Sequence, residues 1–127
     1  MQYSIIIPIF NEINCINILL KHLQPFTLNQ NNEVIIIDDG SDDGTENILK
    51  NCPFIKLIRF KDNRGKGIAL RTGLENANYG KIVLFDGDME LHPRDIKKLM
   101  ILSDHKNINC VFGNRYKSRS VFYSFWD

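Results

Sequence analysis

The stretch KIVLFDGDME, residues 81–90, decides the fold that we expect for this chain. Its first half is an apolar run that is too short for a helix, and it ends abruptly in carboxylates. Such a run predicts a strand that is buried on both faces, as in a parallel sheet covered by helices.

The two aspartates of this stretch lie where the strand passes into a loop. Residues two apart on an extended chain point the same way, about 6.6 Å apart. Gly87 lets the loop bend, so Asp86 and Asp88 could approach one hard cation, with Glu90 as a third oxygen ligand. Asp-Gly-Asp is also an ordinary turn sequence, so the motif alone leaves both interpretations open.

Similar apolar runs, separated by segments with helical spacing, occur along the chain. The other expected strands are Tyr3–Ile9, Glu33–Ile37, Phe54–Phe60 and Asn109–Phe112. The expected helices run from about Ile13 to Leu23, from Asp42 or Asp43 to Asn51, from Gly67 to Asn78, and from Pro93 to Leu102. Alternation of strands and helices predicts an α/β, Rossmann-like domain with a mostly parallel twisted sheet and helices on both faces.

Three details of these elements are specific predictions. The first strand should stop or reach a sheet edge at Pro8, because proline cannot donate a ladder hydrogen bond. Pro25 should belong to the connection after the first helix. Glu46 should act as the capping-box partner at the start of the second helix.

Composition places the chain among ordinary globular proteins. It has 127 residues, 43% apolar and 24% charged, with a net charge of +1, so no global field favours nucleic acid as a partner. We expect no bilayer-spanning segment and no signal peptide, and therefore a cytoplasmic location. Cys15, Cys52 and Cys110 are odd in number and widely spaced, which indicates free thiols in a reducing compartment.

The loops that follow the first four strands should meet at one edge of the sheet, because parallel strands point the same way. These loops are residues 8–12, 38–41, 63–67 and 86–90, and all of them are polar or rich in glycine. Open α/β sheets bind ligands outside the carboxyl ends of their strands. The sequence therefore predicts one ligand site at this edge.

The residue types in these loops suggest separate tasks. Asp38 and Asp39 could accept hydrogen bonds from a base or a ribose, or they could serve only as turn residues. Glu12 could accept from a sugar hydroxyl, or it could be a first-turn acid of the following helix. Arg64 and Lys66 at a glycine-flanked helix start suit a phosphate, although a solvated basic loop is the alternative.

Together these segments resemble a known family. The runs SIIIPIFNE (4–12), VIIIDDGSDDG (34–44), NRGKG (63–67) and FDGDME (85–90) are similar to motifs of inverting family 2 glycosyltransferases of GT-A fold. The pattern is most similar to the branch that contains dolichyl-phosphate mannose synthase and polyprenyl-phosphate glycosyltransferases. In residues 113–116, GNRY, asparagine replaces the serine of that branch's Gly-Ser-Arg-Phe segment.

The resemblance implies a nucleotide-diphospho-sugar donor, such as a UDP- or GDP-sugar, bound with Mg²⁺ or Mn²⁺. The residues that it assigns to the donor are Pro8, Phe10, Glu12, Asp38, Asp39, Arg64, Lys66, Asp86, Gly87 and Arg115. It assigns the metal to Asp86, Asp88 and Glu90, with Asp88 supporting the leaving group, and it identifies no catalytic base. The implied acceptor is a polyprenyl phosphate, which would place the protein at the inner face of the membrane.

From the resemblance, we expect the C-terminal part of the family domain to be absent from this chain. We expect residues 1–116 to form an incomplete donor-binding domain, and the aromatic residues 117–127 to begin the acceptor region or to mediate homo-oligomerisation. A non-catalytic nucleotide-sugar-binding or assembly module is therefore the alternative function. A dinucleotide-dependent oxidoreductase is disfavoured because G-x-G-x-x-G is missing after the first strand, and a receiver domain would not explain residues 63–67.

Overall fold

The computed structural model of the chain describes residues 2–28, 31–90, 92–104, 111–112 and 123–124. The chain divides into two compact units, Met1–Glu90 and Leu91–Asp127. The predicted domain boundary at residue 116 lies outside the described residues. Among the described residues, no helix is both long and apolar enough to cross a bilayer.

The first unit contains a four-stranded parallel sheet. Its strands are β1 (Tyr3–Ile9), β2 (Glu33–Asp38), β3 (Lys56–Arg59) and β4 (Lys81–Leu84). They lie in the order β3-β2-β1-β4, and every pairing is parallel. The prediction of an α/β fold with a parallel sheet is confirmed. The chain order reverses between β1 and β4, which is where open α/β sheets form a ligand crevice.

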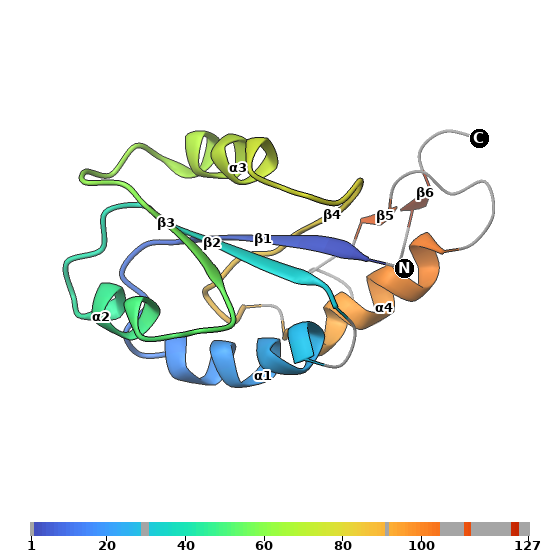
Figure 1. The fold of residues 1–127 in the computed structure, drawn as a ribbon, viewed down its shortest axis with the longest axis horizontal. Helices are drawn as coiled ribbons and strands as arrows, with labels where there is room; N and C mark the ends of the chain where they lie inside the picture. The colour runs from blue at the N-terminus through green and yellow to red at the C-terminus, as the bar shows by residue number, and fades with distance from the viewer. Residues whose placement is uncertain (1, 29–30, 91, 105–110, 113–122, 125–127) are drawn as a thin grey trace. The chain divides into compact units, whose positions relative to one another are not determined.

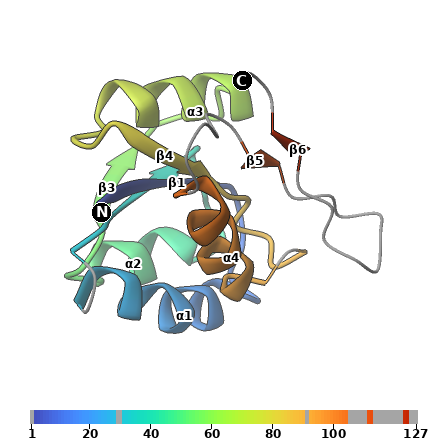
Figure 2. The ribbon, with the colours of Figure 1, turned by 90° about the vertical axis from the view of Figure 1, so that its right-hand side faces the viewer.

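Helices cover both faces of this sheet. Figure 1 shows α3 (Lys66–Glu75) on one face, and α1 (Ile16–Leu28) and α2 (Thr45–Lys50) on the opposite face. The view turned by 90° gives the same three layers (Figure 2). This arrangement explains why the middle of β1 and of β2 is a run of isoleucine and valine, because neither face of these strands meets water.

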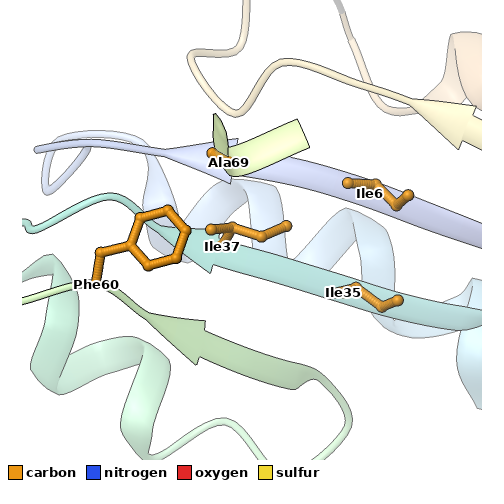
Figure 3. Close-up of a cluster of buried hydrophobic side chains, with 5 residues drawn as sticks. All are labelled: Ile6, Ile35, Ile37, Phe60 and Ala69. Atoms are coloured by element: carbon orange, nitrogen blue, oxygen red, sulfur yellow. The ribbon is translucent and has the colours of Figure 1, made fainter. Parts of the chain in front are cut away.

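The core under α3 is built from alternate residues of two central strands. Ile6 of β1 and Ile35 and Ile37 of β2 are fully buried, and they pack with Phe60 and with Ala69 of α3 (Figure 3). The strand residues between them point to the other face, by the two-residue period of a strand. That face is covered by the apolar residues of α1, which are Ile16, Leu19, Leu20, Leu23 and Phe26.

The second unit contains α4 (Arg94–Ser103) and a two-stranded antiparallel sheet of β5 (Val111–Phe112) and β6 (Tyr123–Ser124). Pro93, the predicted first helical residue, is the N-cap of α4, so the helix begins one residue later, at Arg94. The expected fifth strand, Asn109–Phe112, is described as a strand over Val111–Phe112. In the described residues, β5 pairs antiparallel with β6.

Two predictions about prolines need correction. Strand β1 continues through Pro8, which pairs with Ile37 of β2. On the side of β1 that faces β4, the last hydrogen bond is the one that Phe85 N donates to the Ile6 carbonyl oxygen at 3.0 Å. Pro8 lies beyond this point, so its missing N–H removes no hydrogen bond between β1 and β4. Helix α1 likewise continues through Pro25, and the buried Phe26 secures its last turn.

The start of α2 also differs from the prediction. Its N-cap is Gly44, at a φ of 101°, rather than Asp42 or Asp43. The Asp43 carboxylate accepts a hydrogen bond from Thr45 N at 3.0 Å, and Glu46 accepts one from Gly44 N at 3.1 Å. Glu46 thus bonds the backbone at the helix start, but at Gly44 rather than at Asp43 as predicted, and a glycine supplies the left-handed turn that the chain needs to enter the helix.

Glu33 at the start of β2 connects this strand to the residues before β4. Its carboxylate accepts hydrogen bonds from Ser4 Oγ at 2.5 Å, from Asn78 N at 2.6 Å and from Asn78 Nδ2 at 2.9 Å. Burial opposes ionisation here, but these hydrogen bonds outweigh it and hold the pKa of Glu33 below its ordinary value.

We predict that Glu33→Gln lowers the free energy of unfolding at pH 7 by about 1 kcal/mol, because charged acceptors form stronger hydrogen bonds than neutral ones. A lowered folded-state pKa stabilises the protein above the unfolded-state pKa, and this contribution is lost as the pH falls through the carboxylate range. Urea unfolding of the natural protein and of Glu33→Gln, at pH 7 and again within the carboxylate range, measures this difference in the free energy of unfolding. The difference between them should shrink in acid, and an unchanged difference would contradict the prediction.

Candidate functional site

A hollow of about 350 Å³ opens at the carboxyl edge of the parallel sheet in the first unit. Its lining comes from the end of β1, from the loops after β1, β2, β3 and β4, and from the first residue of α3. The lining residues are Pro8, Ile9, Phe10, Glu12, Asp39, Asn63, Gly65, Lys66, Asp86, Gly87 and Asp88. The predicted convergence of four loops is therefore what the structure shows.

The loop after β1 is fastened to the loop after β2. Asn11, at a φ of 52°, exchanges two side-chain hydrogen bonds with Asp42: Asn11 Nδ2 donates to Asp42 Oδ1 at 3.1 Å, and Asp42 N donates to Asn11 Oδ1 at 2.9 Å. Asn11 N donates to Ser41 Oγ at 2.9 Å, and Glu12 N donates to Thr45 Oγ1 at 3.0 Å. Asparagine tolerates the left-handed conformation better than most residues. These bonds fix the backbone on which Phe10 and Glu12 enter the hollow.

Asp39 positions the third loop. Its carboxylate accepts hydrogen bonds from Arg64 N at 2.6 Å and from Gly65 N at 2.9 Å. Gly40 allows this close approach, because a Cβ there would lie 2.8 Å from Asn63 N and the backbone has a φ of +83°. Asp39 therefore lies against the start of α3 and also lines the hollow.

Asp38 requires a correction, because we predicted that it contacts the donor. Its side chain is fully buried and is not among the lining residues. One carboxylate oxygen accepts from Ser41 N at 2.9 Å, and the other accepts from Arg59 Nε at 3.0 Å. Asp38 thus stabilises the end of β2, and only the second aspartate of the pair reaches the hollow.

The residues after β4 bring two carboxylates to the hollow. Asp86 and Asp88 both line it, and Lys66 Nζ lies 2.5 Å from Asp86 Oδ1. A Cβ on Gly87 would lie 2.7 Å from Ile9 Cγ1, so the absence of a side chain lets this loop lie against β1. Met89 has a φ of 61°, an uncommon conformation for a residue of this type, and it turns the chain away after Asp88.

Glu90 does not complete a set of three carboxylates, and that prediction also needs correction. It is not among the lining residues, and its backbone N–H donates to Asp88 Oδ1 at 2.9 Å. Within the described residues, no three His, Cys, Asp or Glu side chains gather in a way that could hold a metal ion. The left-handed turn at Met89 breaks the two-residue alternation on which the prediction relied.

Of the two predicted arginines, Arg64 is not brought into the hollow, and Arg115 lies outside the described residues. The Arg64 guanidinium lies over the ring of Phe60, 4.8 Å from its centroid, and Arg64 does not line the hollow. Lys66 is thus the basic residue that the described structure places at the site.

Some site residues were missing from the prediction. Asn63 and Gly65 line the hollow. The glycine-rich loop 63–67 indicated them, but we predicted only its charged residues, Arg64 and Lys66, as site residues. Cys15 was predicted only to be a free thiol, and it is one. Its Sγ lies 3.3 Å from Glu12 Oε2 and 3.5 Å from the Gly87 carbonyl oxygen.

The surroundings of Cys15 keep its thiol protonated. Burial, the hydrogen bond to Glu12, and the negative charges of Glu12 and Asp88 raise its pKa to about 11. We predict that Glu12→Gln, which removes one of these charges, lowers this pKa and speeds alkylation of Cys15 severalfold at pH 8, since the thiolate is the nucleophile. Mass spectrometry of iodoacetamide-treated protein gives the rate, with Cys52 as internal reference. An unchanged rate of Cys15 alkylation in Glu12→Gln would show that Glu12 does not contact the Cys15 thiol as described.

A protein-family model matches nearly the whole chain. The family model described as "Glycosyl transferase family 2" matches residues 4–127. The chain belongs to glycosyl transferase family 2. Family membership agrees with the resemblance that the four motifs indicated.

Curated relatives within glycosyl transferase family 2 are much longer than this chain. An uncharacterized protein of Methanocaldococcus jannaschii, MJ0544, is 36% identical over 119 residues, which are 87% of this chain and 50% of that protein. The undecaprenyl-phosphate 4-deoxy-4-formamido-L-arabinose transferase of Aeromonas hydrophila is 33% identical over 104 residues, 76% of this chain and 32% of the relative. The chain therefore spans half or less of these proteins.

Solved structures show the same fold. The mannosyltransferase PcManGT of Pyrobaculum calidifontis, solved with GDP-Man and Mn²⁺, superposes with a TM-score of 0.70 at 23% identity, over 84% of this chain and 33% of that chain. Glucosyl-3-phosphoglycerate synthase of Mycobacterium tuberculosis, solved with Mn²⁺, UDP and glucosyl-3-phosphoglycerate, gives a TM-score of 0.71 at 23% identity, over 84% and 41%. These matches confirm the GT-A architecture.

Proposed function

We propose that this chain forms the donor-binding part of a glycosyltransferase, which transfers a sugar from a UDP- or GDP-sugar to an acceptor with inversion and with Mg²⁺ or Mn²⁺ bound. The observation that carries this proposal is the convergence of Glu12, Asp39, Lys66, Asp86 and Asp88 on one hollow at the switch point of the sheet. Family membership supports the same reaction class.

The nucleoside end of the donor would lie toward β1 and β2. Phe10 is 45% exposed, so its ring offers an apolar surface for a base. An ionised carboxylate has about four acceptor positions, so Asp39 can accept from a base or ribose while it holds the N–H groups of the third loop. Glu12 offers further acceptors on the same side of the hollow.

The diphosphate end would lie between β4 and α3. Asp86 and Asp88 present the hard oxygen ligands that Mg²⁺ and Mn²⁺ prefer. The ammonium group of Lys66 forms an ion pair with Asp86, which indicates that a positive charge fits beside this carboxylate. When bound, a divalent cation would neutralise the leaving diphosphate and lower the barrier to breaking the sugar–phosphate bond. Waters and phosphate oxygens would supply its remaining ligands.

The acceptor is proposed to be a polyprenyl phosphate. The printed name of the Aeromonas hydrophila relative contains undecaprenyl phosphate, and the sequence motifs are similar to that branch. A phosphate is its own nucleophile, so such an acceptor would need orientation more than a strong base. It would place the protein at the inner face of the membrane.

Isothermal titration calorimetry of residues 1–127 with UDP-glucose and GDP-mannose, each with and without Mn²⁺, tests the proposal. We expect one of the two nucleotide families to bind, and to bind more tightly with Mn²⁺. Transfer to a short-chain polyprenyl phosphate is then measured with radiolabelled donor. If neither nucleotide binds in either condition, the proposed function is wrong.

A further inference from the structure

Lys66 and Asp86 form the contact from which we draw a further inference, one that rests on the proposed donor site. Lys66 is the first residue of α3, and Asp86 follows β4, so two separate segments meet at this ion pair. Nζ lies 2.5 Å from Asp86 Oδ1, and both side chains line the hollow.

The charges of the hollow explain why this contact forms. Four carboxylates line it, those of Glu12, Asp39, Asp86 and Asp88, whereas Lys66 is the one cationic residue among the described lining residues. Without a ligand the carboxylates repel one another, and the ammonium group reduces that repulsion. The Lys66 side chain is 58% exposed against 26% for Asp86, so the lysine is the partner with room to move.

We propose that Lys66 is an internal counter-ion that occupies the cation position until a nucleotide diphosphate arrives. A divalent cation that binds Asp86 must displace the ammonium group or lie beside it against like-charge repulsion. A bound diphosphate gives the ammonium group other oxygens to contact, and this frees Asp86 for the cation. The two ligands therefore bind with positive coupling, and each tightens the other by the same factor.

Lys66→Met tests this device, because methionine keeps the length of the side chain and removes the charge. The affinity for Mn²⁺ alone is measured by electron paramagnetic resonance, and again with saturating UDP or GDP, whichever binds. We expect Lys66→Met to bind Mn²⁺ about five- to tenfold more tightly than the natural chain without nucleotide, and its coupling factor to be smaller by the same factor. Lys66→Arg, which keeps the charge, should behave like the natural chain.

Lys61→Met is the matched control, because it removes an exposed lysine of the same connection that does not line the hollow. It should leave both the Mn²⁺ affinity and the thermal unfolding curve of the natural chain unchanged. An equal gain in Lys61→Met would show a general charge effect and would overturn the proposal.

The outcomes separate this inference from the proposed function. If Lys66→Met weakens nucleotide binding but leaves the affinity for Mn²⁺ alone unchanged, Lys66 is only a phosphate contact, and the counter-ion proposal is wrong while the function stands. If no nucleotide binds but Lys66→Met still binds Mn²⁺ more tightly, the counter-ion role stands and the proposed function fails.

Discussion

Asp88→Asn should abolish the tightening of nucleotide-sugar binding by Mn²⁺, with a loss of affinity of at least about tenfold in the presence of the metal. Loss of an outer-shell partner of a metal ligand already costs about 10- to 100-fold in metal affinity, and loss of a ligand should cost no less. Binding without metal should change little, because the variant removes charge at the cation position and leaves the base-binding side of the hollow intact.

The fold should tolerate this substitution. Asp88 is exposed, and its Oδ1 accepts a hydrogen bond from Glu90 N at 2.9 Å, which an asparagine side-chain oxygen can also accept. Calorimetric titration with and without Mn²⁺ measures the effect. Glu75→Gln is the matched control: it removes an exposed acid of α3 whose pairing with Arg71 at 3.2 Å is a surface contact, and it should leave binding unchanged. Full Mn²⁺-dependent binding in Asp88→Asn would exclude Asp88 as a ligand.

Gly73→Ala should destabilise the first unit by about 1–3 kcal/mol, the usual cost of overpacking a core. A Cβ at this position of α3 would lie 2.3 Å from Ile6 Cγ2 and 2.8 Å from Ile37 Cδ1. Both isoleucines are fully buried and belong to the cluster in Figure 3, so neither can move aside without disturbing its neighbours. This penalty should exceed the gain of up to about 1 kcal/mol that alanine normally brings to a helix.

Gly67→Ala provides a control within the same helix. Apart from its chain neighbours and the backbone of its own helix, no atom of the described structure lies within 4 Å of a Cβ built at Gly67, so this variant should be neutral or more stable by up to about 1 kcal/mol. Thermal and urea unfolding of both variants gives the comparison. Equal effects at the two positions would show that α3 does not pack on β1 and β2 as closely as described.

The parallel sheet was predictable because its signal is local and strong. The β1 and β2 runs consist almost entirely of apolar and mainly β-branched residues, and the alternation with helical segments then limits the topology to few choices. The convergence of the loops followed from the direction of the strands alone. The antiparallel pairing of β5 did not follow from the same logic, because two residues carry too little pattern to reveal the pairing partner.

The assignment of individual side chains in the site was less predictable. Asp38 and Asp39 are adjacent and chemically identical, yet Asp38 is sequestered by Arg59 while Asp39 reaches the hollow. Which of the two is exposed depends on strand pairing and on Arg59, 21 residues away along the chain. Glu90 failed for a different reason, since the prediction assumed an extended backbone where Met89 turns left-handed.

The reciprocal bonds between Asn11 and Asp42 have a consequence for engineering. Because the two turns share donors and acceptors, transplanting either of them alone from a relative would leave the remaining one without its counterpart. Chimeric proteins built to alter nucleotide preference should therefore exchange residues 10–13 and 41–45 as a pair. In this chain, two short segments that are distant in sequence would then have to change together.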